Sequence, residues 1–93
     1  MKFVFSNHFS ERNKLRNISM GIATAIFSNA DGHYMDAQTN AFVAVKRIEF
    51  QGRERNVGLT YVIRGDEAVF ITIHPLKEGQ KQNRINNGRW KPL

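Results

Sequence analysis

The sequence contains no cysteine, and this absence removes several classes of protein at once. A disulfide framework, a thiolate catalyst and a zinc site built on cysteine are all excluded. The three histidines, His8, His33 and His74, are too dispersed along the chain to form a metal-binding pair at short spacing. We therefore expect no metal and no other cofactor.

Long apolar runs are also missing. No segment approaches the ~20 apolar residues that a membrane helix needs. The first five residues resemble the start of a signal peptide, but the polar residues from Ser6 to His8 end that run at once. The chain shows no repeat and no linker, and 93 residues are too few for two hydrophobic cores. We expect one cytoplasmic domain over residues 1–93 that has no contact with a membrane.

Positive charge is abundant. Fourteen lysines and arginines stand against eight acids, which gives a formal net charge of +6. The excess gathers at both ends of the chain, before residue 17 and after residue 76. This distribution favours a polyanionic partner through long-range attraction and counterion release. The alternative is a basic surface that is simply solvated.

The first half of the chain predicts two short helices. Lys2–Phe5 is apolar enough for an edge strand or a lead-in segment. Asn7 is a plausible N-cap for a helix over residues 8–16, and Ser19 for a mostly buried helix that continues to Phe27. Two short helices joined by a tight elbow predict an αα-hairpin.

The second half predicts strands. Residues 42–48, 57–64 and 68–74 are rich in β-branched and aromatic side chains, and tight turns at 51–54 and 64–67 join them as antiparallel neighbours. Alternation in the last strand predicts that Val69, Ile71 and Ile73 face the helices, and that Phe70, Thr72 and His74 face away. The tail predicts a short helix around residues 80–86.

These elements predict an α+β fold. In it, an N-terminal helical hairpin packs on an antiparallel sheet of three to four strands, followed by a basic C-terminal tail or short helix.

Four groups of residues are candidates for a site. His8, Arg12 and Arg16 recur every four residues, so they share one stripe of the first helix and could hold phosphates. Lys46 and Arg47 follow a run of small and apolar residues in the strand predicted over 42–48, and they point to opposite faces. The alternatives are a solvated helix face for the first group and cations snorkelling beside the core for the second.

His74 ends the last strand, where loops often carry sites. If the first helix lies over that end of the sheet, His8 and His74 would face each other across a groove. In the tail, amides alternate with cations, and Trp90 lies between Arg89 and Lys91. Such a segment can contact phosphates and stack on an unpaired base. The alternative is that Trp90 packs back on the sheet.

Four segments together resemble a family of small domains related to the BrnT toxins, within the RelE-like group of ribonucleases. They are His8-x3-Arg12-x3-Arg16-x-Ile18-Ser19, Val43–Arg47, Val69–Pro75 and Arg84–Trp90. The resemblance implies a helical hairpin on a curved antiparallel sheet, and a metal-independent endoribonuclease toxin that an antitoxin protein neutralises. By position, the motif residues of that family fall on His8, Arg12, Lys46 and Arg84. The tail differs from that of BrnT itself.

Cleavage of RNA by its own 2′-hydroxyl requires a base, an acid and cations around the phosphate, and no metal. We therefore predict an endoribonuclease in which His8 and His74 exchange protons. Lys46 and Arg84 would stabilise the phosphate. The predicted RNA-binding residues are Arg12, Arg16, Arg47, Arg89 and Trp90. Two alternatives remain: a non-catalytic basic module that contacts RNA or a protein partner, and a structural subunit of a nucleoprotein.

Overall fold

A computed structural model describes the backbone of residues 1–16 and 19–93, and the side chains of residues 1–11 and 19–93. In this part of the chain, three helices accompany a mixed sheet of six strands. The strands are β1 (Lys2–Phe5), β2 (Gly32–Asp36), β3 (Phe42–Phe50), β4 (Arg53–Arg64), β5 (Glu67–Pro75) and β6 (Trp90–Pro92). The helices are α1 (Asn7–Arg16), α2 (Met20–Ser28) and α3 (Gln80–Asn86). The predicted α+β class is confirmed.

The strand order is β1-β5-β4-β3-β2-β6. β1 runs parallel to β5, and all other neighbouring strands are antiparallel. The predicted number of strands, three to four, was therefore too low. The prediction that all strands pair antiparallel is wrong at β1. β2 and β6 escaped prediction because their sequences, GHYMD and WKP, contain no β-branched residue. They are strands because they pair along a neighbouring strand.

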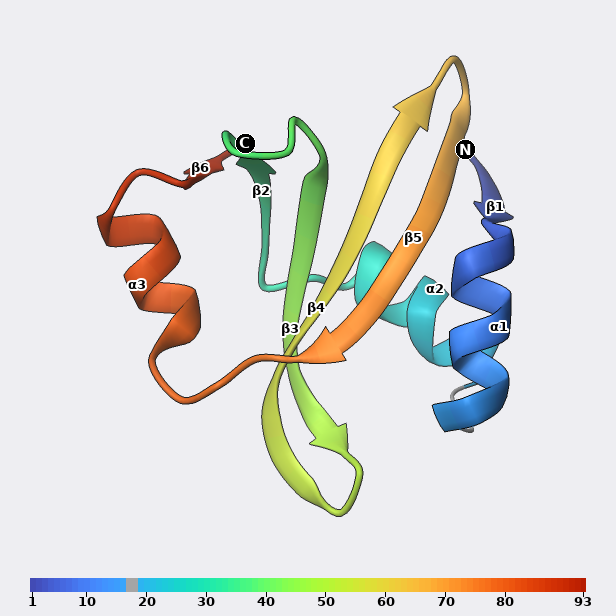
Figure 1. Cartoon of the computed structure of the whole chain (residues 1–93), viewed down its shortest axis with the longest axis horizontal. Coiled ribbons are helices and arrows are strands. Elements are labelled where there is room, and N and C mark those ends of the chain that lie inside the picture. Colours follow the sequence, from blue (N-terminus) through green and yellow to red (C-terminus); the bar gives the residue numbers. More distant parts are fainter. Residues whose placement is uncertain (17–18) are drawn as a thin grey trace.

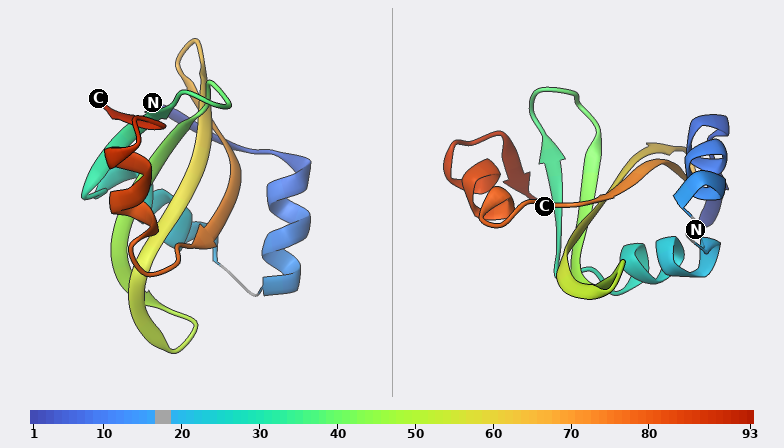
Figure 2. Two further views of the ribbon diagram at one scale, coloured as in Figure 1. Left: turned by 60° about the vertical axis from the view of Figure 1, so that its left-hand side comes forward. Right: turned by 60° about the horizontal axis from the view of Figure 1, so that its bottom comes forward.

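The helices cover both faces of the sheet. Figures 1 and 2 show α1 and α2 on one side, here called the helical side, and α3 on the other, here called the α3 side. α1 makes its main contacts with β5, and α2 with β3 and β4. The predicted hairpin is thus not matched in detail, because the main contacts of α1 and α2 are with different strands of the sheet rather than with each other.

The main core lies on the helical side. Phe9, Ile26, Leu59 and Phe70 are almost completely buried there. Phe27 joins α2 to the sheet, since its ring lies 4.9 Å from that of Tyr61 and 5.7 Å from that of Phe70, measured between centroids. Aromatic contacts of this kind add to the free energy gained from burial. This packing places α2 on the sheet, as predicted.

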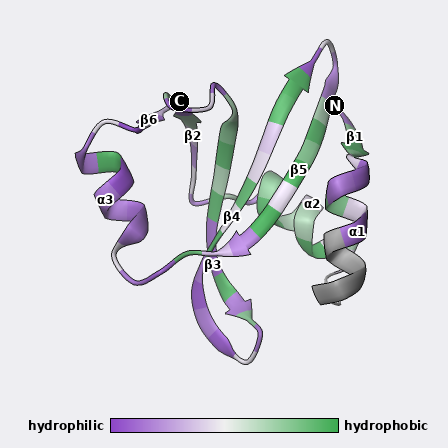
Figure 3. Ribbon diagram, viewed as in Figure 1, coloured by the Kyte–Doolittle hydropathy of each residue, from purple (hydrophilic) through white to green (hydrophobic). Residues whose placement is uncertain are grey.

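A smaller core lies on the α3 side. It contains Tyr34, Val43, Val45, Leu76 and Trp90, with Ile85 of α3 packed against them. The rings of Tyr34 and Trp90 stack with centroids 5.8 Å apart. Figure 3 shows that α3 is largely hydrophilic and that apolar residues concentrate in the strands and α2. α3 is therefore attached by few apolar contacts, and its polar residues remain available at the surface of the sheet.

A β-bulge changes which side chains of β5 face the helices. Tyr61 pairs with Phe70, but the next residue back, Thr60, pairs with Thr72, so Ile71 is an extra residue. Phe70 is buried in the helical core, and Ile71 lines the opposite face. The predicted facing of Phe70 and Ile71 is wrong for this reason, because a bulge shifts the alternation by one residue.

Serine residues cap the starts of α1 and α2. The Ser6 hydroxyl accepts a hydrogen bond from the backbone N–H of Phe9 at 3.1 Å, and the Ser6 carbonyl accepts from Ser10 N–H at 3.0 Å. Ser6 is therefore the N-cap of α1, and Asn7, the predicted cap, is its first helical residue. The predicted cap of α2 is confirmed, because Ser19 accepts from the N–H of Ile22 at 3.2 Å.

Candidate ligand-binding groove

A groove of about 490 Å³ lies on the α3 side of the sheet. This volume is within the range of small-ligand sites. Strands β3, β4 and β5 form its floor, and α3, β6 and the segment after β2 form its walls. It is lined by Asp36, Thr39, Ala41, Val43, Thr60, Val62, Ile71, Thr72, His74, Gln80, Arg84, Arg89 and Trp90.

The floor is apolar with a polar margin. Val43, Val62 and Ile71 supply aliphatic surface from three adjacent strands. Thr60 and Thr72 lie directly opposite each other on β4 and β5, and both line the groove. An apolar surface bordered by hydroxyl groups can bind a flat ring and hydrogen-bond its edge.

Two groups that can carry positive charge border this floor. His74 comes from β5 and Arg84 from the last turn of α3. In the part of the chain that the structure describes, Arg84 forms no ion pair with a carboxylate. A guanidinium that is not paired with a carboxylate is suited to bind an anionic group in two-point fashion.

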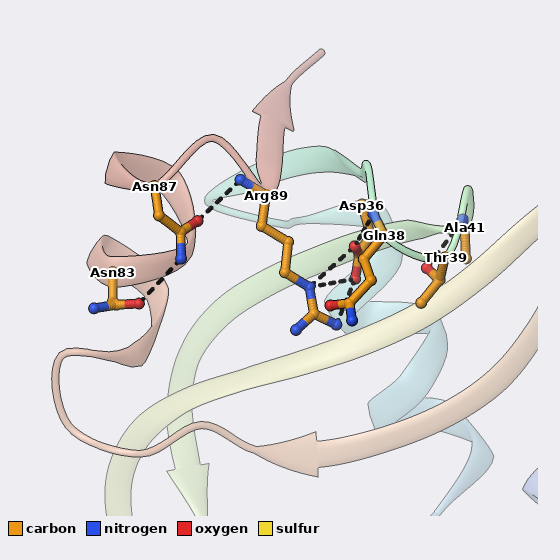
Figure 4. A network of polar contacts seen from close by, with 7 residues as sticks. All are labelled: Asp36, Gln38, Thr39, Ala41, Asn83, Asn87 and Arg89. Carbon is orange, nitrogen blue, oxygen red and sulfur yellow. Dashed lines mark hydrogen bonds and ion pairs between the residues drawn. The ribbon is translucent and has the colours of Figure 1, made fainter.

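Arg89 has a different role from Arg84. Its Nε donates to both carboxylate oxygens of Asp36, at 3.1 and 3.3 Å, and its Nη2 donates to one of them at 3.2 Å (Figure 4). Asp36 also accepts from the backbone N–H of Gln38 at 2.9 Å. The side chain of Arg89 thus joins β6 to the end of β2 rather than pointing to a ligand.

The charge of Arg89 sets the ionisation of Asp36. Burial alone would raise the pKa of Asp36, which is 5% exposed. Hydrogen bonds from Arg89 and from the Gln38 N–H, together with the Arg89 charge, outweigh burial and lower the pKa below its usual value. The Trp90 indole also contributes, although its buried Nε1 makes no hydrogen bond of ordinary geometry in the described residues.

Polar contacts fix the position of α3 beside the groove. At its start, the side chain of Gln80 accepts from the backbone N–H of Lys77 at 2.9 Å. At its end, Asn87 donates to Asn83 at 3.3 Å and accepts from the Arg89 N–H at 2.9 Å (Figure 4). Arg84 is therefore presented by a helix anchored at both ends.

The structure brings together four of the nine residues that the sequence singled out. These are His74, Arg84, Arg89 and Trp90, and all of them line the groove. Trp90 is only 5% exposed and stacks on Tyr34, so it packs on the sheet as the alternative interpretation proposed. Its buried ring leaves little surface on which an unpaired base could stack.

The expected pairing of His8 with His74 is wrong. His8 is an exposed residue of α1, and its neighbour Phe9 packs into the core of the helical side. His74 lines the groove on the α3 side. Because the sheet separates the two faces, the two imidazoles do not border one common groove, and the proton exchange predicted between them has no shared site.

Lys46 and Arg47 also lie outside the groove. Lys46 is 3.9 Å from Asp31, and Arg47 is 3.4 Å from Glu54, measured between charged atoms. The catalytic group predicted for Lys46 beside Arg84 is therefore not assembled. Arg12 and Arg16 are residues of α1, and their side chains, like Ile18, lie outside the described residues.

Sequence reasoning missed several groove residues. For Thr72 there was a signal in the sequence, because alternation along the last strand places it on the same face as His74. Thr60 was predicted only as part of a strand. No sequence signal pointed to Asp36 or Gln80. Asp36 pairs with Arg89, which is distant in the sequence, and Gln80 accepts a hydrogen bond from the backbone of Lys77 in a local turn. Asp36 and Arg89 are 53 residues apart in the chain.

No protein family model, curated protein or solved structure matches this chain. The resemblance to the BrnT-related domains, and the antitoxin partner that it implies, therefore remain predictions from the four motifs. None of the helices in the described residues is long and apolar enough to cross a lipid bilayer.

Proposed function

We propose that this protein is a binding module for single-stranded RNA, and that the groove on the α3 side holds one unpaired nucleotide. One observation carries the proposal: Arg84, which forms no ion pair in the part of the chain that the structure describes, stands with His74 at the margin of an apolar groove of about 490 Å³. A nucleotide joins a flat ring to an anionic phosphate, and this groove offers a surface for each part.

The chemistry of the groove favours a base over an acidic peptide side chain. Val43, Val62 and Ile71 offer apolar surface to a flat ring, and the Thr60 and Thr72 hydroxyls can donate to or accept from the edge of a base. An acidic side chain would use the cation and leave the aliphatic floor without a partner. Proteins that read single-stranded RNA commonly hydrogen-bond the edges of unstacked bases.

The net charge supports the same partner. The chain carries a formal charge of +6, and the predicted basic tail runs beside the groove as α3 and β6. A cationic surface raises the rate at which a polyanion reaches the protein and adds affinity through counterion release.

A second candidate function is cleavage of the bound RNA. It is favoured by the position of His74 and Arg84, two of the four residues predicted to be catalytic, in one groove. His74 would act on the 2′-hydroxyl or the leaving oxygen, and Arg84 would stabilise the phosphate.

Binding is tested with a fluorescently labelled hexauridylate, followed by fluorescence anisotropy. We expect Arg84→Gln to weaken binding by roughly 10- to 150-fold, because a hydrogen bond to a charged group is worth roughly 1.5–3 kcal/mol. The matched control is Arg64→Gln, which removes an exposed cation that does not line the groove. Equal binding by all three proteins would sink the proposed site.

Cleavage is tested by incubating the protein with total RNA in the presence of EDTA. Activity that His74→Ala abolishes would support the second candidate. Intact RNA with the wild-type protein, together with hexauridylate binding, would leave the binding function alone.

A further inference from the structure

The polar side chains around the groove on the α3 side differ in what they can offer a ligand. Asp36 is the one carboxylate among the groove-lining residues that the structure describes. Both of its oxygens accept hydrogen bonds from Arg89, and one also accepts from the Gln38 N–H. The carboxylate is therefore committed to contacts within the protein rather than to an amino group of a ligand.

Gln80, the first residue of α3, presents a donor. Its Oε1 accepts from the backbone N–H of Lys77 at 2.9 Å. A backbone N–H can only donate, so the amide atom that it contacts must be the oxygen, and this contact fixes the orientation of the amide. The Nε2 end, with its two N–H groups, is the part of the side chain that remains for a ligand in the groove that Gln80 lines.

The other polar groups of the groove add mostly donors. Arg84 carries only N–H groups, and Arg89 retains one Nη that is not used on the carboxylate. The hydroxyls of Thr60 and Thr72 can donate or accept, and a neutral His74 has one ring nitrogen of each kind. Donors therefore outnumber acceptors at the margin of the groove.

The two pyrimidine bases of RNA differ at the edge that meets such a margin. Uracil and cytosine have the same ring, but uracil carries a carbonyl oxygen where cytosine carries an amino group. The carbonyl oxygen can accept from the Gln80 Nε2–H, whereas the amino group would set one donor against another. A donor that is buried without an acceptor is unfavourable, so cytosine fits this margin less well than uracil.

We propose that the groove selects uridine over cytidine, and that Gln80 is the residue that determines this choice. The inference rests on the proposed function and goes further by naming the base. Arg84 adds affinity for either nucleotide, because the phosphate is common to both. Gln80 distinguishes them, because its amide contacts the part of the base in which they differ.

The test is a competition between two unlabelled oligonucleotides for the full chain. Labelled hexauridylate is displaced by hexauridylate or by hexacytidylate, and fluorescence anisotropy gives both affinities. We expect hexauridylate to bind at least about fivefold more tightly, the lower end of the discrimination that a good side-chain contact to a base edge gives. The two competitors carry equal numbers of phosphates, so the ratio of their affinities reports on the base.

One variant should reverse the preference. Gln80→Glu retains an oxygen for the Lys77 N–H and places a second oxygen where Nε2 was. That oxygen accepts from the cytosine amino group and repels the uracil carbonyl, so we expect the ratio to favour hexacytidylate. The matched control is Gln82→Glu, which adds the same charge to α3 at an exposed residue that does not line the groove. It should change the ratio less than twofold.

A wild-type ratio near one would overturn the inference, and binding that still depends on Arg84 would then leave the proposed RNA function standing. An unchanged ratio in Gln80→Glu, or an equal change in Gln82→Glu, would also overturn it, because the preference would not come from the Gln80 amide. If neither oligonucleotide bound, the inference and the proposed function would fail together.

Discussion

At the scale of single residues, the Asp36 carboxylate depends on one partner. It is buried at 5% exposure, and Arg89, which is 29% exposed at its side chain, supplies three of its hydrogen-bond contacts. The pair closes one end of the groove and holds β6 against β2. We therefore expect removal of the Asp36–Arg89 pair to lower the free energy of unfolding.

Arg89→Gln should lower the free energy of unfolding by about 2–3 kcal/mol at neutral pH. Breaking a fully buried ion pair costs roughly 3–5 kcal/mol. We expect a smaller cost here because the Arg89 side chain is partly exposed to solvent. Urea unfolding followed by circular dichroism measures the loss. Lys91→Gln removes an exposed cation two residues away and should change stability by less than about 0.5 kcal/mol. Equal losses in the two variants would contradict the role given to Arg89.

The same pair predicts a dependence of stability on acid. The pKa of Asp36 is lowered by folding, so its contribution is present above the unfolded value of about 3.9 and is lost as pH falls through the folded value. In Arg89→Gln this contribution disappears. The urea midpoint of wild type should therefore fall more steeply than that of the variant below about pH 4. Parallel curves would show that Asp36 is not the titrating group.

Tyr61 predicts the opposite behaviour in alkali. Burial raises its pKa, and its hydroxyl lies 2.7 Å from His33 Nδ1. In the neutral imidazole, Nε2–H donates to the Phe27 carbonyl at 3.1 Å, so Nδ1 accepts from the Tyr61 hydroxyl. Stability due to the neutral phenol is complete below about pH 10 and is lost as pH rises through the folded pKa. Tyr61→Phe should show a shallower alkaline loss in urea unfolding; a loss as steep as that of wild type would contradict this assignment.

At the scale of elements, the start of α1 distinguishes a cap from its neighbour. Ser6→Ala should cost about 1 kcal/mol, because it removes the acceptor of the Phe9 N–H. Asn7→Ala, one residue on, should be close to neutral, since Asn7 is already helical and exposed. Thermal unfolding of both variants provides the comparison. A larger loss of stability in Asn7→Ala than in Ser6→Ala would show that Asn7 is the N-cap.

The bulge in β5 is the element that shapes the groove. Because Ile71 is an extra residue opposite the Thr60–Tyr61 step, Ile71 and Thr72 both line the α3 side while Phe70 and Ile73 enter the helical core. A regular strand would place Ile71 and Thr72 on opposite faces. The apolar floor and its hydroxyl margin therefore exist together because of one irregularity.

At the scale of the whole molecule, the net charge of +6 predicts salt-sensitive binding. For a single strand, the logarithm of affinity should fall with the logarithm of salt with a slope of about −0.7 for each phosphate contacted. Arg84→Gln should make that slope smaller by about 0.7, and Arg64→Gln should leave it unchanged. Anisotropy titrations over a range of sodium chloride measure the slopes. Salt-independent binding would exclude a phosphate-based interaction.

Much of the fold could be read from local patterns. Runs such as Val57 to Arg64 combine β-branched residues with turn residues at their ends, and Ser19 precedes an apolar helix with a side chain that can cap it. These signals are local, so β3, β5, α2 and α3 were predicted close to their observed bounds. β4 begins at Arg53, four residues before the predicted start, because its polar first residues carry no strand signal of their own. The candidate site was predicted only in part, as His74, Arg84, Arg89 and Trp90.

The sequence by itself determined the chemical inventory: no cysteine, excess positive charge, and strands and helices whose periods are written in neighbouring residues. Tertiary structure alone decided which of those groups meet. It placed His8 and His74 on different faces, neutralised Lys46 and Arg47 with Asp31 and Glu54, and paired Asp36 with Arg89. The reason is physical. Propensity and period act over a few residues, whereas burial, strand register and ion pairing depend on residues brought together from distant parts of the chain.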